Sequence, residues 1–415
     1  MKGLARSAAN AVGGLAVVLA AFLPAACTNA RPATGPPGAS KAIAKTPGGG
    51  GSAPSARAKS PSNRLPGMPP LLSPTDVYAA DRPGLFSPVV RQHRALVYVP
   101  NTLDNTVSVI DQQTMKVIDT FPVGREPQHV VPAYDLKTLY VAADYVPAGG
   151  GPGAGSLTPI NPVTGTLGRP FAIDDPYNLY FTPDGRLAIV VAEARKRLDF
   201  YDPRTWQRRY SLPVPSCAGV DHMDFTADGR TLLASCEYAD RVIAVDVAHR
   251  RVLRTIALAR RGDGMPQDVK LSPDGKTFYV ADMIADGVYL IDGAATKVIG
   301  FLATGRGAHG LYIDRTSTRL FVTNRLAGSI TVINLATRTP SMTWRLPGKT
   351  SPDMGNLSAD GTTFWLSGRY NNVVYAISTI DGHLIRQMAV GRGPHGLCVW
   401  PQPGRYSIGH TGILR

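Results

Sequence analysis

Short runs in which apolar and polar residues alternate recur along the chain from about residue 95 to its end. Typical runs are LVYVPN (96–101), TFYVADM (277–283) and TFWLSGR (363–369), which are rich in β-branched and aromatic residues. A period of two predicts half-buried β-strands. No segment keeps a 3.6-residue apolar period, and 43 glycines and 35 prolines would interrupt long helices. The pattern therefore excludes a helical solenoid and predicts an all-β fold.

The predicted strands fall into a repeated unit of about 43 residues. In four units the first strand ends in a similar turn: TPDG (182–185), TADG (226–229), SPDG (272–275) and SADG (358–361). Glycine at the last position supplies the positive φ that such a turn needs. Three further strand signals follow in each unit. Repeated four-stranded units of this length predict the blades of a β-propeller.

Counting the first, innermost strands predicts seven blades. These strands begin near Pro127, Pro176, Val220, Pro266, Ala308, Pro352 and Pro394. The first unit has no clear inner strand, whereas the last inner strand, PHGLCVW (394–400), has no third or fourth strand after it. We therefore predict a seven-bladed β-propeller in which this C-terminal inner strand completes the first blade and leaves no open sheet edge. RYSIGHT (405–411) also aligns with a second strand, although residues 94–100 already fill that role.

Two segments carry a resemblance to a known family. Tyr98-Val99-Pro100-Asn101 and Phe321-Val322-Thr323-Asn324 resemble the Tyr-Val-Thr-Asn signature of the YVTN propellers, the surface-layer and YncE-like proteins. The resemblance covers about residues 85–415. It implies the propeller fold and says little of function, because such propellers include binding scaffolds and a few enzymes. The chain departs from the repeat at residues 145–161, where we expect an exposed glycine-rich loop in the second blade.

The N-terminal residues resemble an export signal. Lys2 and Arg6 precede an apolar run, AVGGLAVVLAAFL (11–23), that is short for a membrane span. Leu23-Pro24-Ala25-Ala26-Cys27 resembles a lipoprotein box, in which Cys27 would be lipidated, and Thr28-Asn29-Ala30 offers ordinary signal cleavage instead. Residues 1–27 are thus predicted to be a signal, 28–75 a disordered tether rich in Pro, Gly, Ala and Ser, and 76–415 the propeller.

Much of the positive charge lies outside the predicted propeller. The formal net charge is +14, and residues 1–75 hold eight basic residues and no acidic one. A basic tail of this kind affects solubility and adhesion, so nucleic-acid binding is the least favoured function. Aromatic residues do not interleave with the basic ones, as a single-strand platform would require. An exported chain can form disulfides, and we predict a Cys217–Cys236 bond with Cys398 a free, buried thiol.

Polar residues gather where the inner strands begin, at one end of the predicted channel. We call this end the mouth. Arginines stand two residues before the proline-equivalent position, and histidines, acids and amides stand one or two residues after it. The predicted ligand-binding residues are Arg125, Arg306, Arg392, Lys349, His309, His395, Asp353 and His129. Neighbouring strand residues point to opposite sides, which argues against one shared metal site because His309 and His395 stand one residue after the proline position, whereas His129 and His222 stand two after it.

Three interpretations of the mouth remain open at this stage. In the first, the residues only build turns and solvate the channel. In the second, guanidinium groups flanked by glycines capture a carboxylate or phosphate. In the third, His309, Asp353 and His395 hold a metal ion or perform acid–base chemistry. The sequence contains no Cys-x-x-Cys-His motif for covalent haem, no Gly-x-Ser-x-Gly motif and no nucleotide-binding glycine loop.

The sequence therefore predicts an exported propeller, lipid-anchored on the outer side of the cell membrane or else secreted. We expect a monomeric binding scaffold for an anionic or polar small molecule, or for an envelope polymer or protein. The alternative is a propeller enzyme, such as a lyase, a lactonase or a metal-dependent oxidoreductase, with its site at the mouth. No cofactor is identified.

Overall fold

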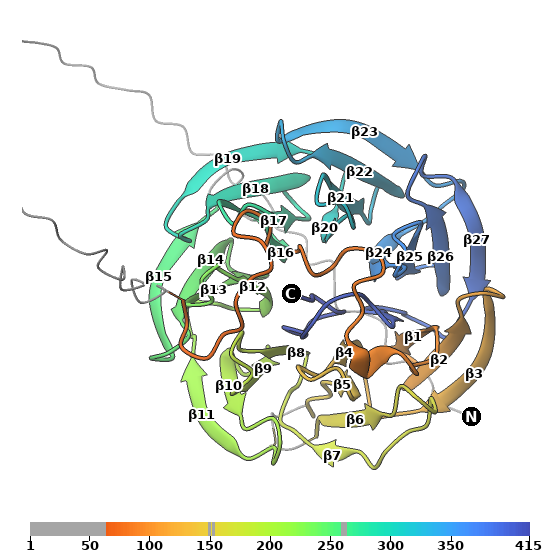
Figure 1. The fold of residues 1–415 in the computed structure, drawn as a ribbon, viewed down its shortest axis with the longest axis horizontal. Coiled ribbons are helices and arrows are strands. Elements are labelled where there is room, and N and C mark those ends of the chain that lie inside the picture. The colour runs from red at the N-terminus through yellow and green to blue at the C-terminus, as the bar shows by residue number, and fades with distance from the viewer. Residues whose placement is uncertain (1–63, 148–150, 152–153, 259–263) are drawn as a thin grey trace, which may run out of the picture. The chain divides into compact units, whose positions relative to one another are not determined.

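Seven four-stranded antiparallel sheets form a β-propeller (Figure 1). The computed structural model describes residues 64–147, 151, 154–258 and 264–415. Within these residues the only helix is the short 3-10 helix η1 (Pro88–Val90). The predicted all-β seven-bladed propeller is therefore confirmed.

The first blade joins the two ends of the propeller. Its strand order is β28-β1-β2-β3, and these strands are Cys398–Trp400, Leu96–Asn101, Thr106–Asp111 and Lys116–Pro122. β28 pairs with β1 through Leu96 and Trp400, Val97 and Val399, and Tyr98 and Cys398. The C-terminal strand thus supplies the inner strand of the first blade, as the sequence predicted, and covers the edge of β1 that would otherwise be open.

The other six blades follow the chain in order, each from the inner to the outer strand. The strands of blades 2, 3 and 4 are β4 (Pro127–Pro132), β5 (Leu139–Ala143), β6 (Ser156–Ile160), β7 (Phe171–Ala172), β8 (Asn178–Phe181), β9 (Ala188–Ala192), β10 (Arg197–Tyr201), β11 (Arg208–Pro213), β12 (Val220–Phe225), β13 (Thr231–Cys236), β14 (Arg241–Asp246) and β15 (Arg251–Ala257). Those of blades 5, 6 and 7 are β16 (Pro266–Leu271), β17 (Thr277–Asp282), β18 (Gly287–Asp292), β19 (Val298–Ala303), β20 (Ala308–Ile313), β21 (Arg319–Asn324), β22 (Ser329–Asn334), β23 (Thr339–Arg345), β24 (Pro352–Leu357), β25 (Thr363–Gly368), β26 (Val373–Ser378) and β27 (Leu384–Ala389).

The turns that end the inner strands have the expected backbone. Gly185, Gly229, Gly275 and Gly361 all have φ between 68° and 76°, a conformation that a side chain would strain. The expected loop at 145–161 needs a correction. Residues 156–160 form β6, the third strand of blade 2, and pair with β5 in continuous register. The departure from the repeat thus ends by residue 155.

A segment before the first blade covers the end of the channel opposite the mouth. Residues 64–90, which we call the N-terminal strap, include part of the predicted tether. Leu65 N–H donates to Asp228 O at 2.7 Å, and Val77 N–H donates to Pro273 O at 2.8 Å. Both acceptors lie in the turns that end inner strands, whereas the mouth lies where those strands begin. Residues 64–75 therefore pack against the propeller.

The residues after β28 enter the centre of the ring (Figure 1). Residues 401–415 form the C-terminal tail, and almost all of them are buried. Gly409 bridges to Tyr180 of β8, Asn356 of β24 donates to Gly412 O at 3.1 Å, and Arg415 donates to Asp224 of β12 at 2.8 Å. The segment 405–411, which aligned with a second strand, thus lies in the channel and fills it.

The predicted signal, Cys27 and the first part of the predicted tether lie outside the described residues. In the part of the chain that is described, no helix has the length and apolar character needed to cross a bilayer.

Candidate functional site

The mouth is built by an irregularity repeated at the start of the inner strands. In β4, β12, β16, β20 and β24 the pairing with the second strand is interrupted directly after the first residue. Such a bulge bends the strand and re-aims the next side chains. Asp221 and His222, adjacent in β12, are both fully buried, and their side chains face each other, with His222 Nδ1 2.6 Å from Asp221 Oδ1. The expectation that neighbouring positions point to opposite sides is wrong here, because the bulge breaks the strand alternation.

The four predicted histidine positions come together at the mouth. The ring centroid of His129 lies 5.3 Å from that of His222 and 4.9 Å from that of His395, and His309 lies 6.0 Å from His395. All four rings are at most 3% exposed. Burial lowers the pKa of each, to about 4 for His222 and well below the usual value for the other three. Burial therefore favours the neutral form of all four imidazoles.

Asp353 connects two of these histidines to a buried arginine. His395 Nδ1 lies 2.7 Å from Asp353 Oδ2, and His309 Nδ1 lies 3.3 Å from Oδ1. Arg325 Nε donates to Asp353 Oδ1 at 2.8 Å, and its Nη2 also contacts His309 Nε2. Burial alone would raise the pKa of Asp353, but the Arg325 guanidinium and His309 lower it below its usual value. His309, Asp353 and His395 do converge, but the guanidinium occupies the position beside the carboxylate, which disfavours a metal cation there.

A second ring of residues at the mouth follows the second strand of each blade. In blade order these residues are Thr102, Asp144, Glu193, Glu237, Met283, Arg325 and Arg369. The acids therefore stand on blades 2–4 and the guanidinium groups on blades 6 and 7. This ring was not predicted from the sequence. It could have been found by comparing the residue that directly follows each Tyr-Val-Thr-Asn-like second strand.

Burial acts on several carboxyl groups in the acidic half of the mouth. Burial raises the pKa of Asp144 to about 8, and Gln128 donates to its Oδ1 at 3.3 Å. Burial, with the nearby carboxyl of Glu237, also raises the pKa of Glu193 and of Asp221 well above the usual value. Burial thus favours the protonated, uncharged form of these carboxyl groups, and a nearby cation or strong donor would favour the charged form.

The basic half contains a guanidinium, that of Arg369, for which the described residues provide no carboxylate partner. Arg369 Nη1 donates to Thr102 Oγ1 at 3.0 Å and to Gly393 O at 3.1 Å. Within the described residues no ion pair involves Arg369, while Arg325 pairs with Asp353. Arg369 also lowers the pKa of His395, after the larger effect of burial, so its field reaches the histidine cluster. The basic half thus holds two guanidinium groups against one carboxylate.

The four basic residues that were predicted from the sequence lie on exposed loops. Arg125, Arg306, Lys349 and Arg392 are all exposed. Arg392 Nε donates to Asp104 Oδ1 at 2.7 Å, and the Arg125 guanidinium lies 3.4 Å above the Tyr145 ring. Arg125 and Arg392 therefore already have partners. The arginines that form part of the mouth are Arg325 and Arg369.

A fifth histidine, His410, joins the cluster from the C-terminal tail. Its ring centroid lies 4.6 Å from that of His222 and 5.5 Å from that of His129. One nitrogen from each of these three residues lies within 4.8 Å of the other two. The repeat alignment did not find His410 because the tail belongs to no blade.

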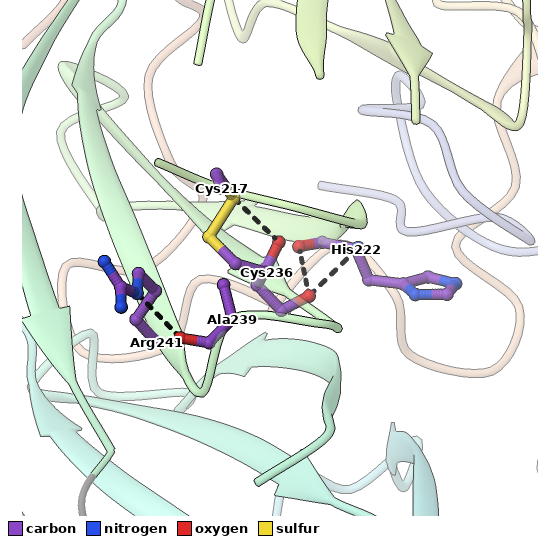
Figure 2. The surroundings of a disulfide bond; sticks show 6 residues. Cys217, His222, Cys236, Ala239 and Arg241 are labelled. Atoms are coloured by element: carbon purple, nitrogen blue, oxygen red, sulfur yellow. Dashed lines mark hydrogen bonds between the residues drawn. A yellow bond between two sulfur atoms is a disulfide. The ribbon is translucent and has the colours of Figure 1, made fainter. Parts of the chain in front are cut away.

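A disulfide fixes the start of β12. Cys217 and Cys236, the pair expected from the sequence, are joined with their Cα atoms 4.8 Å apart, and Cys398 is free and buried. Figure 2 shows the bond beside the start of β12, with the His222 ring pointing away from the sulfur atoms. Ser235 Oγ accepts from His222 N–H and donates to His222 O, both at 3.1 Å. The disulfide and Ser235 together hold the backbone that carries His222.

The fold and the mouth define a seven-bladed propeller with a channel centre rich in histidine. The chain belongs to the YNCE-like β-propeller family, whose model matches residues 87–403. A search of curated protein sequences gives no significant match.

Several solved structures are similar to this propeller. A functionally unknown protein from Desulfotomaculum acetoxidans superposes with a TM-score of 0.59 at 14% identity, covering 73% of this chain and 98% of that one. Kuenenia stuttgartiensis hydrazine synthase gives 0.56 at 18% identity, covering 72% and 97%. The dihydro-heme d1 dehydrogenase NirN, in complex with DHE, gives 0.55 at 15%, covering 81% and 83%. At these identities the likeness shows the fold alone.

Proposed function

We propose that this chain is a binding propeller whose mouth takes a small anionic ligand, carrying a carboxylate or phosphate group. The observation that supports this most directly is Arg369, a partly buried guanidinium with no carboxylate partner in the described chain. Excess buried positive charge is unfavourable alone and is compensated by a bound anion. The Tyr177 hydroxyl lies 3.3 Å from His395 Nε2 and feels the charge of Arg369. It offers a bound anion a further polar contact.

The opposite half of the mouth favours a second polar group on the same ligand. Asp144, Glu193 and Glu237 stand across the ring from Arg325 and Arg369 in blade order. A ligand with an anionic end and a hydrogen-bond donor at the other end would match both halves. The proposal therefore favours a polar small molecule over a long uniformly charged polymer.

Replacing Arg369 by glutamine is expected to abolish the binding of succinate, used as an anionic probe, in isothermal titration. In the wild-type protein the affinity should fall as ionic strength rises. The matched control is Arg306→Gln, which removes an exposed arginine and should leave both the affinity and the melting temperature unchanged. The reverse result, with binding lost in Arg306→Gln and kept in Arg369→Gln, would place the anion on the outer loops and contradict the proposal. Absence of binding of any probe anion by the wild type would do the same.

The same groups support an enzyme as a second candidate. Neutral imidazoles beside carboxyl groups with raised pKa values are typical of acid–base sites. Two proteins of similar fold are enzymes by name: the dehydrogenase NirN and hydrazine synthase. Turnover of a bound ligand that stops in His395→Gln, with ligand binding retained, would favour this candidate.

We also propose that the chain is exported and anchored to the membrane through Cys27, on the strength of the signal-like residues 1–27. Cys27→Ser is expected to move the protein from the membrane fraction to the soluble extracytoplasmic fraction of its host. A variant that stays with the membrane to the same extent would show that Cys27 is not the anchor.

A further inference from the structure

One position on the face of the propeller at the mouth is apolar in every blade. In six blades the second and third strands are joined by four residues, and the second of these directly follows the second ring of mouth residues. Blade 2 has a longer connection that begins in the same way. In blade order the residues at this position are Leu103, Tyr145, Ala194, Tyr238, Ile284, Leu326 and Tyr370, which we call the apolar crown.

Most of the strongly exposed apolar side chains of the described chain belong to the crown. Six large apolar side chains in the described residues are at least half exposed, and four of them are Leu103, Tyr238, Leu326 and Tyr370. Exposed apolar residues are ordinary when they are scattered singly, but these recur at one position around one end of the channel. The repetition marks this face as a surface for interaction.

The turns themselves do not require the apolar side chains. Residues at such turns are usually Gly, Asn, Asp or Ser. The positive φ of the four-residue turns falls on the fourth residue, as at Asn105, Asp240 and Gly328, where φ is 56°, 46° and 61°. Asn, Asp and Gly adopt that conformation most readily. The backbone of each turn is therefore provided for two residues after the crown position.

The neighbouring loops hold the crown leucines in place. Leu103 N–H donates to Arg392 O at 3.1 Å. A Cβ atom at Gly393 would lie 3.0 Å from Leu103 Cγ, and one at Gly307 would lie 2.7 Å from Leu326 Cγ. These are the second glycines of the two Gly-Arg-Gly loops, so they leave room for the leucines. A side chain that is already positioned loses less conformational entropy when a partner binds.

The loops around the crown carry an excess of positive charge. Among the residues described in the loops of this face, Glu126 is the one exposed acidic residue, whereas five exposed residues are basic. The basic residues are Arg125, Lys196, Arg306, Lys349 and Arg392. Tyrosine and arginine are enriched where proteins bind each other, and complementary charge selects the partner. We propose that the crown docks a partner protein through a surface that exposes apolar side chains among acidic ones.

Other occupants fit the crown less well. A second copy of the chain would bring the same basic loops together, and residues 1–63 contain basic residues but no acidic one. A bilayer would accept the crown side chains but offers no hydrogen-bond partners to the polar mouth that they surround. A protein surface can present apolar groups to the crown and polar groups to the mouth. This inference is independent of the anion proposed to bind at Arg369.

The test selects a phage-displayed library of random peptides on the purified protein. The recovered peptides should share acidic and apolar residues, and a synthetic peptide of this kind should bind more weakly as ionic strength rises. The double variant Leu103→Ser/Leu326→Ser should bind it about 10-fold more weakly or worse, because it removes two exposed apolar contacts. The matched control is Leu253→Ser/Ile299→Ser, which removes two exposed apolar side chains from the outer strands β15 and β19 and should bind as the wild type.

Succinate titration of the same variants separates this inference from the proposed function. The crown variant should bind succinate as the wild type does, while Arg369→Gln tests the anion alone. If the double variant does not fold, Tyr238→Ser gives the same comparison at one crown residue. Failure to recover any peptide, equal peptide binding by the crown and control variants, or a wild-type dimer that dissociates in the crown variant would overturn the proposal. Binding to phosphatidylglycerol vesicles that is lost in the crown variant, with no peptide bound, would assign the crown to a membrane instead.

Discussion

A chain that lacks residues 394–415 is expected to lose its cooperative unfolding transition and to aggregate. The deletion removes β28, so the hydrogen-bonding edge of β1 becomes exposed. It also removes the tail, which buries Tyr406, Ile408, Ile413 and Leu414 in the channel and pairs Arg415 with Asp224. Loss of these side chains would leave both a cavity and an unpaired buried carboxylate.

A shorter deletion separates the contribution of β28 to stability from that of the C-terminal tail. A chain that ends at Gln402 keeps β28 and its pairing with β1 but loses most of the tail. We expect this variant to remain soluble and to unfold cooperatively at a clearly lower temperature, as followed by circular dichroism and calorimetry. A 394–415 deletion as soluble and heat-stable as the full chain would show that β28 does not close the ring.

Asp353→Asn should lower the free energy of unfolding at neutral pH by about 3–5 kcal/mol, because breaking a buried ion pair leaves an uncompensated charge. Asp353 is fully buried, and its carboxylate is shared by Arg325, His309 and His395. Asparagine keeps the size of the side chain, so the loss reports charge and hydrogen bonding rather than packing. Urea denaturation of the two proteins measures the difference.

The pH dependence of that difference has a definite sign. Since the folded pKa of Asp353 lies below its usual value, its stabilisation is present above the unfolded value of about 3.9 and is lost as pH falls through the folded pKa. The control is Asp104→Asn, which breaks the exposed pair with Arg392 and should cost at most about 1 kcal/mol. Equal losses in the two variants would show that Asp353 is not a buried electrostatic centre.

The blades could be predicted from the sequence because each signal is local. Glycine supplies the positive φ of the Asp-Gly turns at 184–185, 228–229, 274–275 and 360–361, whatever the rest of the chain does. Strand alternation likewise depends only on neighbouring residues. The closing role of residues 394–400 followed from counting strands in the first and last units. The path of the tail did not follow, because residues 405–411 carry a strand-like pattern and only the space inside a complete ring shows where they fit.

The convergence of side chains at the mouth was predicted in part. The proline-equivalent positions pointed to His129, His309, Asp353 and His395, and these residues do meet. The bulges that aim them depend on pairing between strands, which strand alternation alone does not describe. Arg325 and Arg369 were missed because the arginines of the Gly-Arg-Gly loops matched the repeat more visibly, although Arg306 and Arg392 are exposed.

The position of a bound anion in crystals of the protein tests most directly whether the mouth binds an anion at Arg369. A selenate soak locates the anion by anomalous scattering. We expect a peak within hydrogen-bond distance of the Arg369 guanidinium, about 2.7–3.2 Å, on the side of the mouth that also contains His395 and Tyr177. A peak at Arg306 or Lys349 with none at Arg369 would contradict it.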